Sequence, residues 1–326
     1  MRIRGGCAVL WRQQGVSQIG TSPERRIIIN DLSLAEQRLL DELARSLEVG
    51  GVYRTARRSR VPVARARQIV EDLKHQGIVV PSTASEPGGA DGVYWDRLGT
   101  DAKSRATVLS QTILAVHGIS ALAQEAALWL AEAGVGTILS TLAPKDGGLE
   151  PLLSARFPAV RTRAPLRTRP DVMVTVDAHV VEPLLARRLV QEDIAHLPVV
   201  VGEAGVRVGP LLGAGGPCST CLNLWEQDAD PCWPALATQM RTLPMPDVEH
   251  LILHEAAALV ARAVIDTVLG QALPVTSAAD GPEPGGEPAG RSAAWWTTHS
   301  VEVTGKAPLG RVRSWESHPE CLCSQL

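Results

Sequence analysis

Four of the six cysteines in this chain stand in two close pairs. Cys218 and Cys221 form a Cys-x-x-Cys motif directly after a Gly-Gly-Pro turn, and Cys321 and Cys323 form a Cys-x-Cys motif about a hundred residues later. Each close pair can turn both of its sulfurs toward one metal ion, and together the two pairs supply a tetrahedral shell. Because soft thiolates in closed four-coordination suit Zn²⁺, the spacing predicts a structural zinc site without a catalytic role.

Two alternatives remain for these residues. A redox-active Cys-x-x-Cys is the main rival for Cys218 and Cys221, but such a motif normally opens a helix after a strand, and here a turn precedes it. His318 lies close enough to Cys321 to replace one thiolate as a minor variant. The isolated Cys7 and Cys232 are expected to be small buried residues.

Composition narrows the class of protein. The chain has 326 residues, of which 45% are hydrophobic and 21% charged, as in a soluble globular protein of about two domains. A net charge of −3 gives no general reason to expect binding to nucleic acid or membranes. The first residues do not resemble a signal peptide, and no apolar run is long enough to span a membrane. We therefore expect a cytoplasmic location.

The elements at the N-terminus predict a small domain over residues 1–80. A Ser-x-x-Glu capping box at Ser33 and Glu36 predicts a helix that ends at Gly50-Gly51. Hydrophobic spacing predicts two further helices, and β-branched runs predict the strands. The expected order is strands 7–11, 17–20 and 26–29, then three helices, of which the second covers 52–58 and the third runs from Pro62 to Gly77, then strand 78–80. This is a winged helix-turn-helix behind a three-stranded sheet.

This small domain is locally basic, with seven Lys and Arg against two acids between Tyr53 and Lys74. Three interpretations are open. The charges are a solvated helix face, or the third helix enters a DNA major groove, or an extended peptide adds to the sheet as a further strand. The peptide would then lie between strand Arg26–Ile29 and the third helix.

After a polar linker over residues 81–105, the pattern changes to that of an α/β domain over residues 106–326. A strand within 108–116, a helix over 120–133 and a strand over 137–142 make a strand-helix-strand unit. Further strands are expected at 171–176, 197–201 and 206–212, with a helix over 180–189 and a long helix over 247–271. Together they predict a mostly parallel sheet. Two antiparallel strands, 294–303 and 310–315, lead to the second cysteine pair.

A strand-helix-strand unit of this kind is typical of nucleotide-binding domains, but the residues of this one argue against nucleotide binding. A phosphate-binding turn needs several glycines, and His117-Gly118-Ile119-Ser120 supplies one. The nearest acid after the second strand is Asp146, beyond a proline, where a ribose-binding acid would come directly after the strand. Asp177 follows another strand and is interpreted as a turn residue in preference to a site residue. No catalytic residue is assigned, and the histidines are expected to be structural.

The whole chain resembles a known family. Ala133-Gly134-Val135-Gly136 before an apolar strand, and the run to Gly-Gly-Pro-Cys-x-x-Cys, are similar to the ThiF/MoeB-type, ubiquitin-activating-like superfamily. Other segments resemble one branch of it, the TOMM (thiazole/oxazole-modified microcin) cyclodehydratase-like or precursor leader-peptide-binding proteins. These segments are Val208-Gly209-Pro210-Leu211, residues 230–236 (DPCWPAL) and the terminal His-Pro-x-Cys-x-Cys.

The resemblance implies a ThiF-like Rossmann-type domain behind an N-terminal RiPP (ribosomally synthesised, post-translationally modified peptide) recognition element. It also implies a non-catalytic scaffold that binds a precursor's leader peptide and presents its core to a cyclodehydratase for thiazoline or oxazoline formation. The residues assigned to peptide binding are Arg26, Ile27, Ile28, Ile29, Arg65, Ile69 and Lys74. Structural Zn²⁺ is the expected cofactor, ATP is not, and a homodimer is left open. The alternatives are a ThiF-type adenylyltransferase with a degenerate nucleotide loop and a winged-helix DNA-binding regulator.

Overall fold

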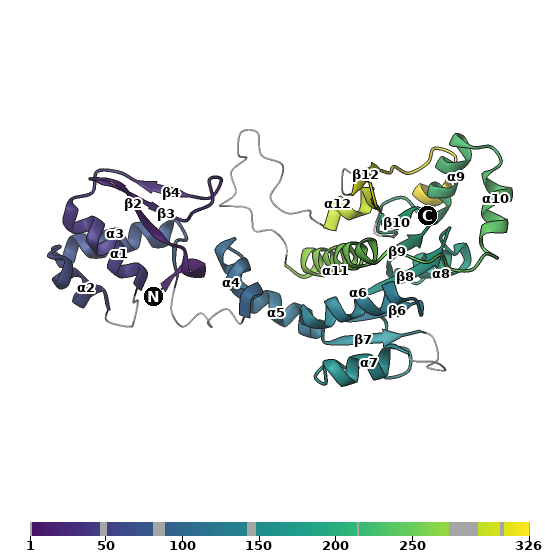
Figure 1. Cartoon of the computed structure of the whole chain (residues 1–326), viewed down its shortest axis with the longest axis horizontal. Coiled ribbons are helices and arrows are strands. Elements are labelled where there is room, and N and C mark those ends of the chain that lie inside the picture. The colour runs from purple at the N-terminus through teal and green to yellow at the C-terminus, as the bar shows by residue number, and fades with distance from the viewer. Residues whose placement is uncertain are drawn as a thin grey trace. The chain divides into compact units, whose positions relative to one another are not determined.

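The computed structural model describes residues 2–45, 51–80, 89–141, 148–213, 215–273, 293–306 and 310–325. The chain divides into two compact units, residues 1–106 and 107–326. Figure 1 shows the elements of both. Within the described ranges, no helix has the length and apolar character needed to cross a membrane.

The first unit begins with short strands and continues with helices. Its elements in chain order are β1 (Arg2–Ile3), η1 (Arg4–Gly6), β2 (Val9–Gln13), β3 (Val16–Ile19), β4 (Ile27–Ile29), α1 (Leu34–Arg45), α2 (Gly51–Ser59), α3 (Val63–His75), β5 (Val79–Val80) and α4 (Gly89–Arg97); α5 (Ala102–Gln111) crosses the boundary between the units. Strands β2, β3 and β4 form an antiparallel sheet in that order, and β1 pairs with β5. The three strands and three helices expected from the sequence are all present.

The helix signals of the sequence work as expected at α1 and α3. The Ser33 backbone N–H donates to Glu36 Oε2 over 2.7 Å, and the Glu36 N–H donates to Ser33 Oγ over 3.3 Å, which confirms the capping box. The predicted helix end at Gly50-Gly51 is wrong in part: Gly51 is the first residue of α2, and Gly50 lies outside the described residues.

The segment expected to be a linker, residues 81–105, is described from Gly89 onward, and there it differs from that expectation. Residues 89–97 form α4, which packs against η1. Asp96 explains this packing, because its carboxylate accepts hydrogen bonds from Arg2 and, over 2.5 Å, from the Gly5 N–H. Partners more than ninety residues away in the chain leave no local signal, so the sequence does not reveal that α4 belongs to the first unit.

Replacing Asp96 by Asn is expected to destabilise the first unit by about 1–2 kcal/mol at neutral pH. Burial alone would raise the pKa of the Asp96 carboxyl, but the hydrogen bonds from Arg2 and Gly5 outweigh it and hold the pKa below its ordinary value of 3.8. The ionised form is therefore the stabilising one. Its contribution is present above pH 3.8 and is lost as the pH falls through the lower, folded-state pKa. Urea denaturation of the wild type and of Asp96→Asn at pH 7 and pH 3 measures this contribution. The difference between their free energies of unfolding should shrink in acid, and a difference that grows would contradict the prediction.

The second unit contains the larger sheet and the helices that cover it. Its elements are β6 (Ile113–His117), α6 (Ala121–Glu132), β7 (Thr137–Ser140), α7 (Leu149–Arg156), β8 (Val172–Ala178), α8 (Pro183–Gln191), β9 (Ala195–Val201), β10 (Gly205–Val208), α9 (Ser219–Ala229), α10 (Trp233–Met240), α11 (His250–Ala272), α12 (Ala293–Thr298), β11 (His299–Thr304), β12 (Arg311–Ser314) and η2 (Leu322–Gln325).

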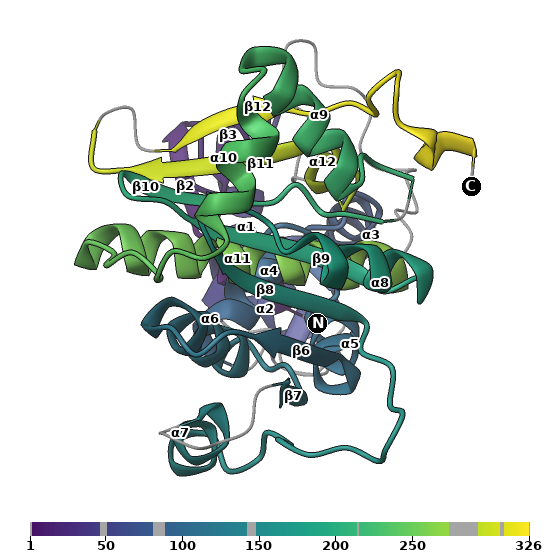
Figure 2. The same ribbon diagram turned by 90° about the vertical axis from the view of Figure 1, so that its right-hand side faces the viewer.

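Seven strands make one mixed sheet in the order β12-β11-β10-β9-β8-β6-β7 (Figure 2). The pairings from β7 to β9 are parallel, and those from β9 to β12 are antiparallel. The mostly parallel sheet expected from the sequence is therefore half right. A short turn joins β9 to β10, with the Gly202 N–H donating to the Gly205 carbonyl, and so short a connection cannot join parallel strands.

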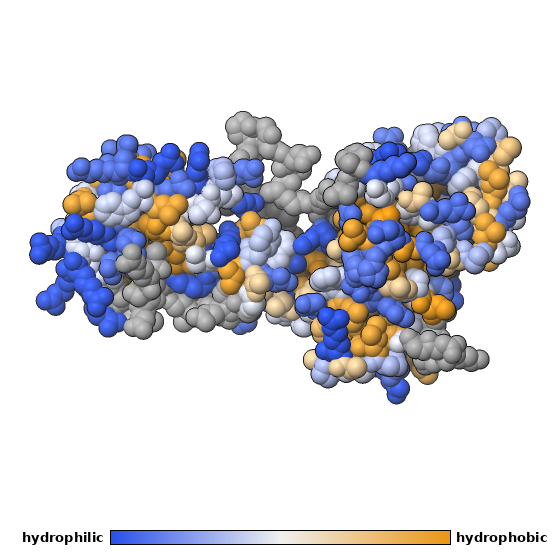
Figure 3. Space-filling model, viewed as in Figure 1, coloured by the Kyte–Doolittle hydropathy of each residue, from blue (hydrophilic) through white to orange (hydrophobic). Residues whose placement is uncertain are grey.

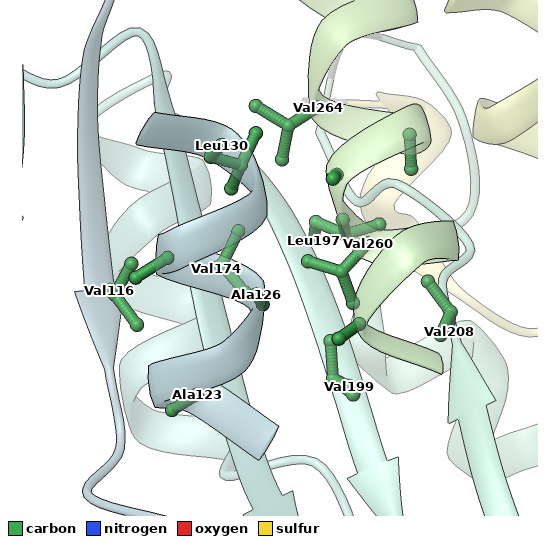
Figure 4. Close-up of a cluster of buried hydrophobic side chains, with 14 of the residues drawn as sticks. Val116, Ala123, Ala126, Leu130, Val174, Leu197, Val199, Val208, Val260 and Val264 are labelled. Carbon is green, nitrogen blue, oxygen red and sulfur yellow. The ribbon is translucent and has the colours of Figure 1, made fainter. Parts of the chain in front are cut away.

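The main core lies between the sheet and helices α6 and α11 (Figure 4). Leu130 of α6, Val174 of β8 and Leu197 of β9 are fully buried there. Each such side chain stabilises the fold by about 1.5–3 kcal/mol through removal of apolar surface from water. Helices α8 and α9 cover the other face of the sheet, through smaller clusters that include Leu189, Leu222 and Trp315.

The strand predicted over residues 294–303 is wrong in its first half, which forms α12. Trp296 is fully buried there, beside α11, and its Nε1 donates to Asp266 Oδ2 over 3.3 Å. The Trp-Trp-Thr-Thr run favours a strand by propensity, but burying this indole beside α11 outweighs a preference worth about 1 kcal/mol at most. The second half is β11, and β12 pairs with it in the antiparallel direction as predicted.

Candidate metal centre and peptide-binding face

The first cysteine pair stands at the start of α9. Cys218 is the residue before the helix, and Cys221 lies in its first turn. Gly216 lets the chain approach α12 closely, because a Cβ there would lie 2.7 Å from the Thr297 carbonyl oxygen. The motif therefore opens a helix, contrary to the sequence-based argument against a redox pair. The choice between zinc and redox chemistry depends instead on the other cysteines.

The second pair follows β12 and is held by His318. This buried histidine uses both ring nitrogens: Nε2 lies 3.0 Å from Asp228 Oδ2, and Nδ1 accepts a hydrogen bond from the Glu320 N–H over 3.2 Å. Its carbonyl oxygen accepts a bond from the Cys321 N–H over 2.9 Å. His318 thus shapes the loop that carries the cysteines, and the idea that it replaces a thiolate ligand is wrong. Asp228 was not identified from the sequence, which gives no sign of a partner ninety residues away.

The four cysteine sulfurs converge, and all lie within 4.8 Å of one another. Individual separations are 3.8 Å for Cys218–Cys221, 3.6 Å for Cys218–Cys321 and 3.3 Å for Cys221–Cys323. Ligands at about 2.3 Å from a tetrahedral zinc ion lie about 3.8 Å apart, so the cluster has nearly the size that Zn²⁺ requires. A redox dithiol needs only two of these four sulfurs.

The surroundings of the sulfurs also suit a cation. Burial alone would raise the pKa of the Cys218 thiol, but the N–H groups of Cys221 and Thr220 donate to its sulfur and the pKa is lowered. Burial raises the pKa of the Cys321 and Cys323 thiols. If all four sulfurs were ionised, the thiolates would repel one another at these distances. A divalent cation bound among them would offset that repulsion.

The two remaining cysteines differ from the prediction that both are buried. Cys232 is exposed and Cys7 is half-buried. Cys232 is the residue before α10, a helix that contributes no residue to the core clusters. Its side chain is therefore exposed to solvent.

The predicted peptide-binding residues of the sheet lie at its edge. Strand β4 pairs with β3 alone among the described residues, so its other side has unpaired main-chain groups. Ile27 and Ile29 are half-buried against the core of the unit, whereas Ile28 is 41% exposed on the opposite face. Arg26 precedes the strand and is exposed.

The predicted residues of α3 have other partners. Arg65 Nε lies 2.6 Å from Glu36 Oε1, and Lys74 pairs with Glu71. Ile69 is 6% exposed and belongs to the core cluster, so the structure does not bring it to the surface. Figure 3 shows hydrophilic residues over the part of this unit around α2. The remaining basic residues there include Arg67, whose guanidinium lies 4.8 Å from the ring centroid of Tyr53.

The turn between β6 and α6 is the place where a nucleotide would bind in a Rossmann-type domain. Gly118 has φ +142°, and a Cβ there would lie 3.1 Å from Val176 Cβ, so this glycine serves close packing on β8. Ser120 caps α6 by accepting from the Ala123 N–H over 3.3 Å, and His117 Nδ1 lies 2.7 Å from Thr141 Oγ1. Leu142 and Asp146, which the sequence argument used, lie outside the described residues.

Asp177 and His196 meet at Thr175. The Thr175 hydroxyl donates to Asp177 Oδ2 over 2.8 Å, so it accepts from His196 Nε2 at 2.9 Å. Burial lowers the pKa of His196 to about 3, which keeps the ring neutral. Asp177 lies within β8 rather than in a turn, burial raises its pKa, and the Glu182 N–H donates to it. These contacts hold the strand end and the following loop together.

No family model matches the chain, and no curated protein does. The fold is nevertheless a known one, shared over the full length with enzymes of microcin biosynthesis. Escherichia coli MccB solved with ATP matches with a TM-score of 0.63 at 12% identity, covering 98% of each chain. The microcin C7 biosynthetic enzyme MccB in complex with N-formylated MccA matches with a TM-score of 0.63 at 12% identity over 99% of each chain.

A heterocyclase in complex with substrate and cofactor contains a part with a similar fold. It matches with a TM-score of 0.66 at 13% identity, over 97% of this chain and 38% of the heterocyclase. At such identities the likeness establishes the fold alone. That fold, a seven-stranded mixed sheet preceded by a small N-terminal unit, agrees with the Rossmann-type α/β domain expected from the sequence.

Proposed function

We propose that this protein binds the leader of a ribosomally made precursor peptide and presents the peptide to a partner cyclodehydratase for thiazoline or oxazoline formation. The observation that carries the proposal is the open edge of β4 in a chain whose whole fold is shared with MccB, which was solved with the peptide MccA. The likeness to a heterocyclase solved with substrate supports the same class of biosynthesis.

The N-terminal unit is proposed to be a winged-helix recognition element that receives the leader as an added strand. Main-chain groups on the free side of β4 would supply affinity, and side chains on either face of the sheet would supply specificity. Arg26 is free to meet an acidic leader residue, and Ile28 offers apolar contact. Because Arg65 and Lys74 are paired with acids and Ile69 is buried, we place binding mainly on Arg26–Ile29.

Zinc is the cofactor we propose for the cluster of Cys218, Cys221, Cys321 and Cys323. The protein fills all four positions, which leaves none for substrate or water, so the metal would be structural. It would fasten the loop after β12 to the start of α9.

A second candidate function is adenylyl transfer. It is favoured by the similarity to MccB, whose crystal structure was solved with ATP. It is opposed by the turn before α6, which contains one glycine where a phosphate-binding turn has several. ATP–pyrophosphate exchange with the precursor present decides between the two: exchange above background would establish the enzyme and refute a scaffold without chemistry. DNA binding is less well supported, because Arg58, Arg65 and Lys74 are already paired with acids.

The peptide proposal predicts that Ile28→Asp weakens leader binding at least about tenfold, because a charge beside the added strand disrupts cross-strand packing. The matched control is Leu10→Asp. Leu10 is 40% exposed, against 41% for Ile28, and both align with Gln18 of β3 on the same face, at opposite edges of the sheet.

The measurement is fluorescence anisotropy with a labelled synthetic peptide from an open reading frame beside the gene, divided into leader and core halves. Binding of the leader half, lost in Ile28→Asp and kept in Leu10→Asp, is the expected result. Equal losses in both variants, or no binding by any neighbouring peptide, would refute the β4 site.

A further inference from the structure

A cavity of about 250 Å³ lies in the second unit, over the antiparallel strands of the sheet. Its floor includes residues of β10, β11 and β12, and α9 forms one wall. The sequence pattern does not single out Arg207, Ser300 or Arg313, which line this cavity. It is distinct from the metal cluster, whose cysteines do not line it, and from the turn before α6.

Arg207 is the central group of this cavity. It lies in β10 between Val200 of β9 and Glu302 of β11, and its side chain is 22% exposed. Its Nη1 is 3.6 Å from Glu226 Oε1, which is close enough for charge attraction but too long for a hydrogen bond. Its Nε is buried and has no hydrogen-bond partner among the described residues. Because buried polar groups are nearly always paired, this donor indicates a site for an acceptor.

A second guanidinium explains why Arg207 is incompletely neutralised. Arg313 of β12 lies 2.6 Å from the same Glu226 oxygen, and thus takes the closer contact with it. Both guanidinium groups gather over one indole, at 3.8 Å from the Trp315 ring centroid for Arg313 and 5.3 Å for Arg207. Burial lowers the pKa of Arg207 and Arg313 lowers it further, while Glu226 and Glu302 oppose them without restoring it.

Among the other polar groups of the cavity, the Ser300 hydroxyl can donate a hydrogen bond to a ligand. Ser300 Oγ accepts a hydrogen bond from Trp315 Nε1 over 2.8 Å, so the Ser300 proton is available to a further acceptor. Asn223 is held in place by two bonds, since its Nδ2 donates one hydrogen to the Ser219 carbonyl and its Oδ1 accepts from Trp233 Nε1. Glu302 also lines the cavity, but it stands cross-strand from Arg311 as well as from Arg207.

We propose that this cavity binds a carboxylate group, held by Arg207 and by the hydroxyl of Ser300, with Arg313 close by. A carboxylate offers two acceptor oxygens in the plane of a guanidinium fork, which is the geometry that Arg recognises best. Both a free peptide C-terminus and an acidic side chain carry this group. The inference does not rest on leader binding at β4, because the two sites lie in different units.

The test is a titration of the full-length protein, followed by tryptophan fluorescence, since Trp233 lines the cavity and the Trp315 indole contacts Arg207 and Arg313. The probes are N-acetylglycine for a C-terminal carboxylate, N-acetylglutamate amide for an acidic side chain, inorganic phosphate, and N-acetylglycine amide as the uncharged control. Saturable binding of a carboxylate probe is expected, with affinity falling at least about tenfold in Arg207→Met. Arg163→Gln removes an exposed arginine of the same unit that does not line the cavity, and it should bind as the wild type does.

Arg313→Gln provides a second variant in case the loss of Arg207 alters the fold, and it is expected to weaken binding several-fold. A preference between the two carboxylate probes identifies the source of the group, and either preference supports the site. The proposal is overturned if no carboxylate probe binds, if the uncharged amide or phosphate binds as well as the carboxylates do, or if Arg207→Met and Arg313→Gln both keep wild-type affinity.

Discussion

Replacing Cys218 by Ser is expected to abolish zinc binding and to lower the melting temperature of the second unit. Cys218 lies within 3.8 Å of Cys221 and Cys321, so its loss leaves an incomplete shell and three thiols that repel when ionised. A structural zinc ion contributes its binding energy to folding. Losing even about 4 kcal/mol of that energy lowers the melting temperature of a domain of this size by roughly 8–16 °C.

The chain contains its own control for this experiment. Cys232→Ser changes the same atoms at an exposed cysteine outside the cluster and should leave zinc content and melting unchanged. Metal content by atomic emission and melting by circular dichroism measure the two effects, with EDTA-treated wild type as reference. If Cys218→Ser kept one zinc ion per chain and the wild-type melting temperature, the metal centre would be excluded.

The second large effect is expected from Gly136→Ala, which should destabilise the second unit by about 3 kcal/mol or more. A Cβ at this position would lie 1.8 Å from the Ser110 carbonyl oxygen. The backbone cannot move away, because the Gly136 N–H donates to the Leu109 carbonyl over 2.9 Å and its own carbonyl accepts from the Arg161 N–H over 2.9 Å. The overlap is with main chain, so no change of rotamer relieves it.

Gly134→Ala is the comparison for this variant. Gly134 belongs to the same Ala-Gly-Val-Gly segment and has φ +101°, yet a Cβ there would meet no atom within 4 Å. Its replacement costs only backbone strain, about 1–2 kcal/mol. Guanidinium denaturation of both variants separates steric overlap from strain. A Gly136→Ala protein as stable as Gly134→Ala would mean that β7 can shift away from α5.

The parts of the fold that follow local rules were predictable from the sequence. The capping box at Ser33 and Glu36, the buried face of α3 and the hydrophobic strands β8 and β9 each depend on residues a few positions apart. The convergence of the four cysteines was predictable for a different reason. Two close cysteine pairs in one chain are typical of a shared metal site, so the residue type and spacing alone predict that the four sulfurs lie together.

What escaped prediction depends on distant partners. Trp296 turns a strand-like run into α12 because Asp266 and the side of α11 receive its indole. Asp96 brings α4 onto β1 and η1 through Arg2 and Gly5, and β1 pairs with β5 in the first unit. Arg207 and Arg313 come together only because β10, β11 and β12 are neighbours in the sheet. None of these contacts leaves a periodic signal in the sequence.

The cysteine cluster has a consequence for the topology of the chain. Cys218 and Cys321 are 103 positions apart, and between them lie α9, α10, α11, α12, β11 and β12. A metal ion bound by both pairs closes this stretch into a loop, and the entropy that such closure removes from the unfolded chain grows with the logarithm of loop length. The ion would therefore act as a reversible cross-link, holding a third of the protein in a ring for as long as all four sulfurs stay reduced.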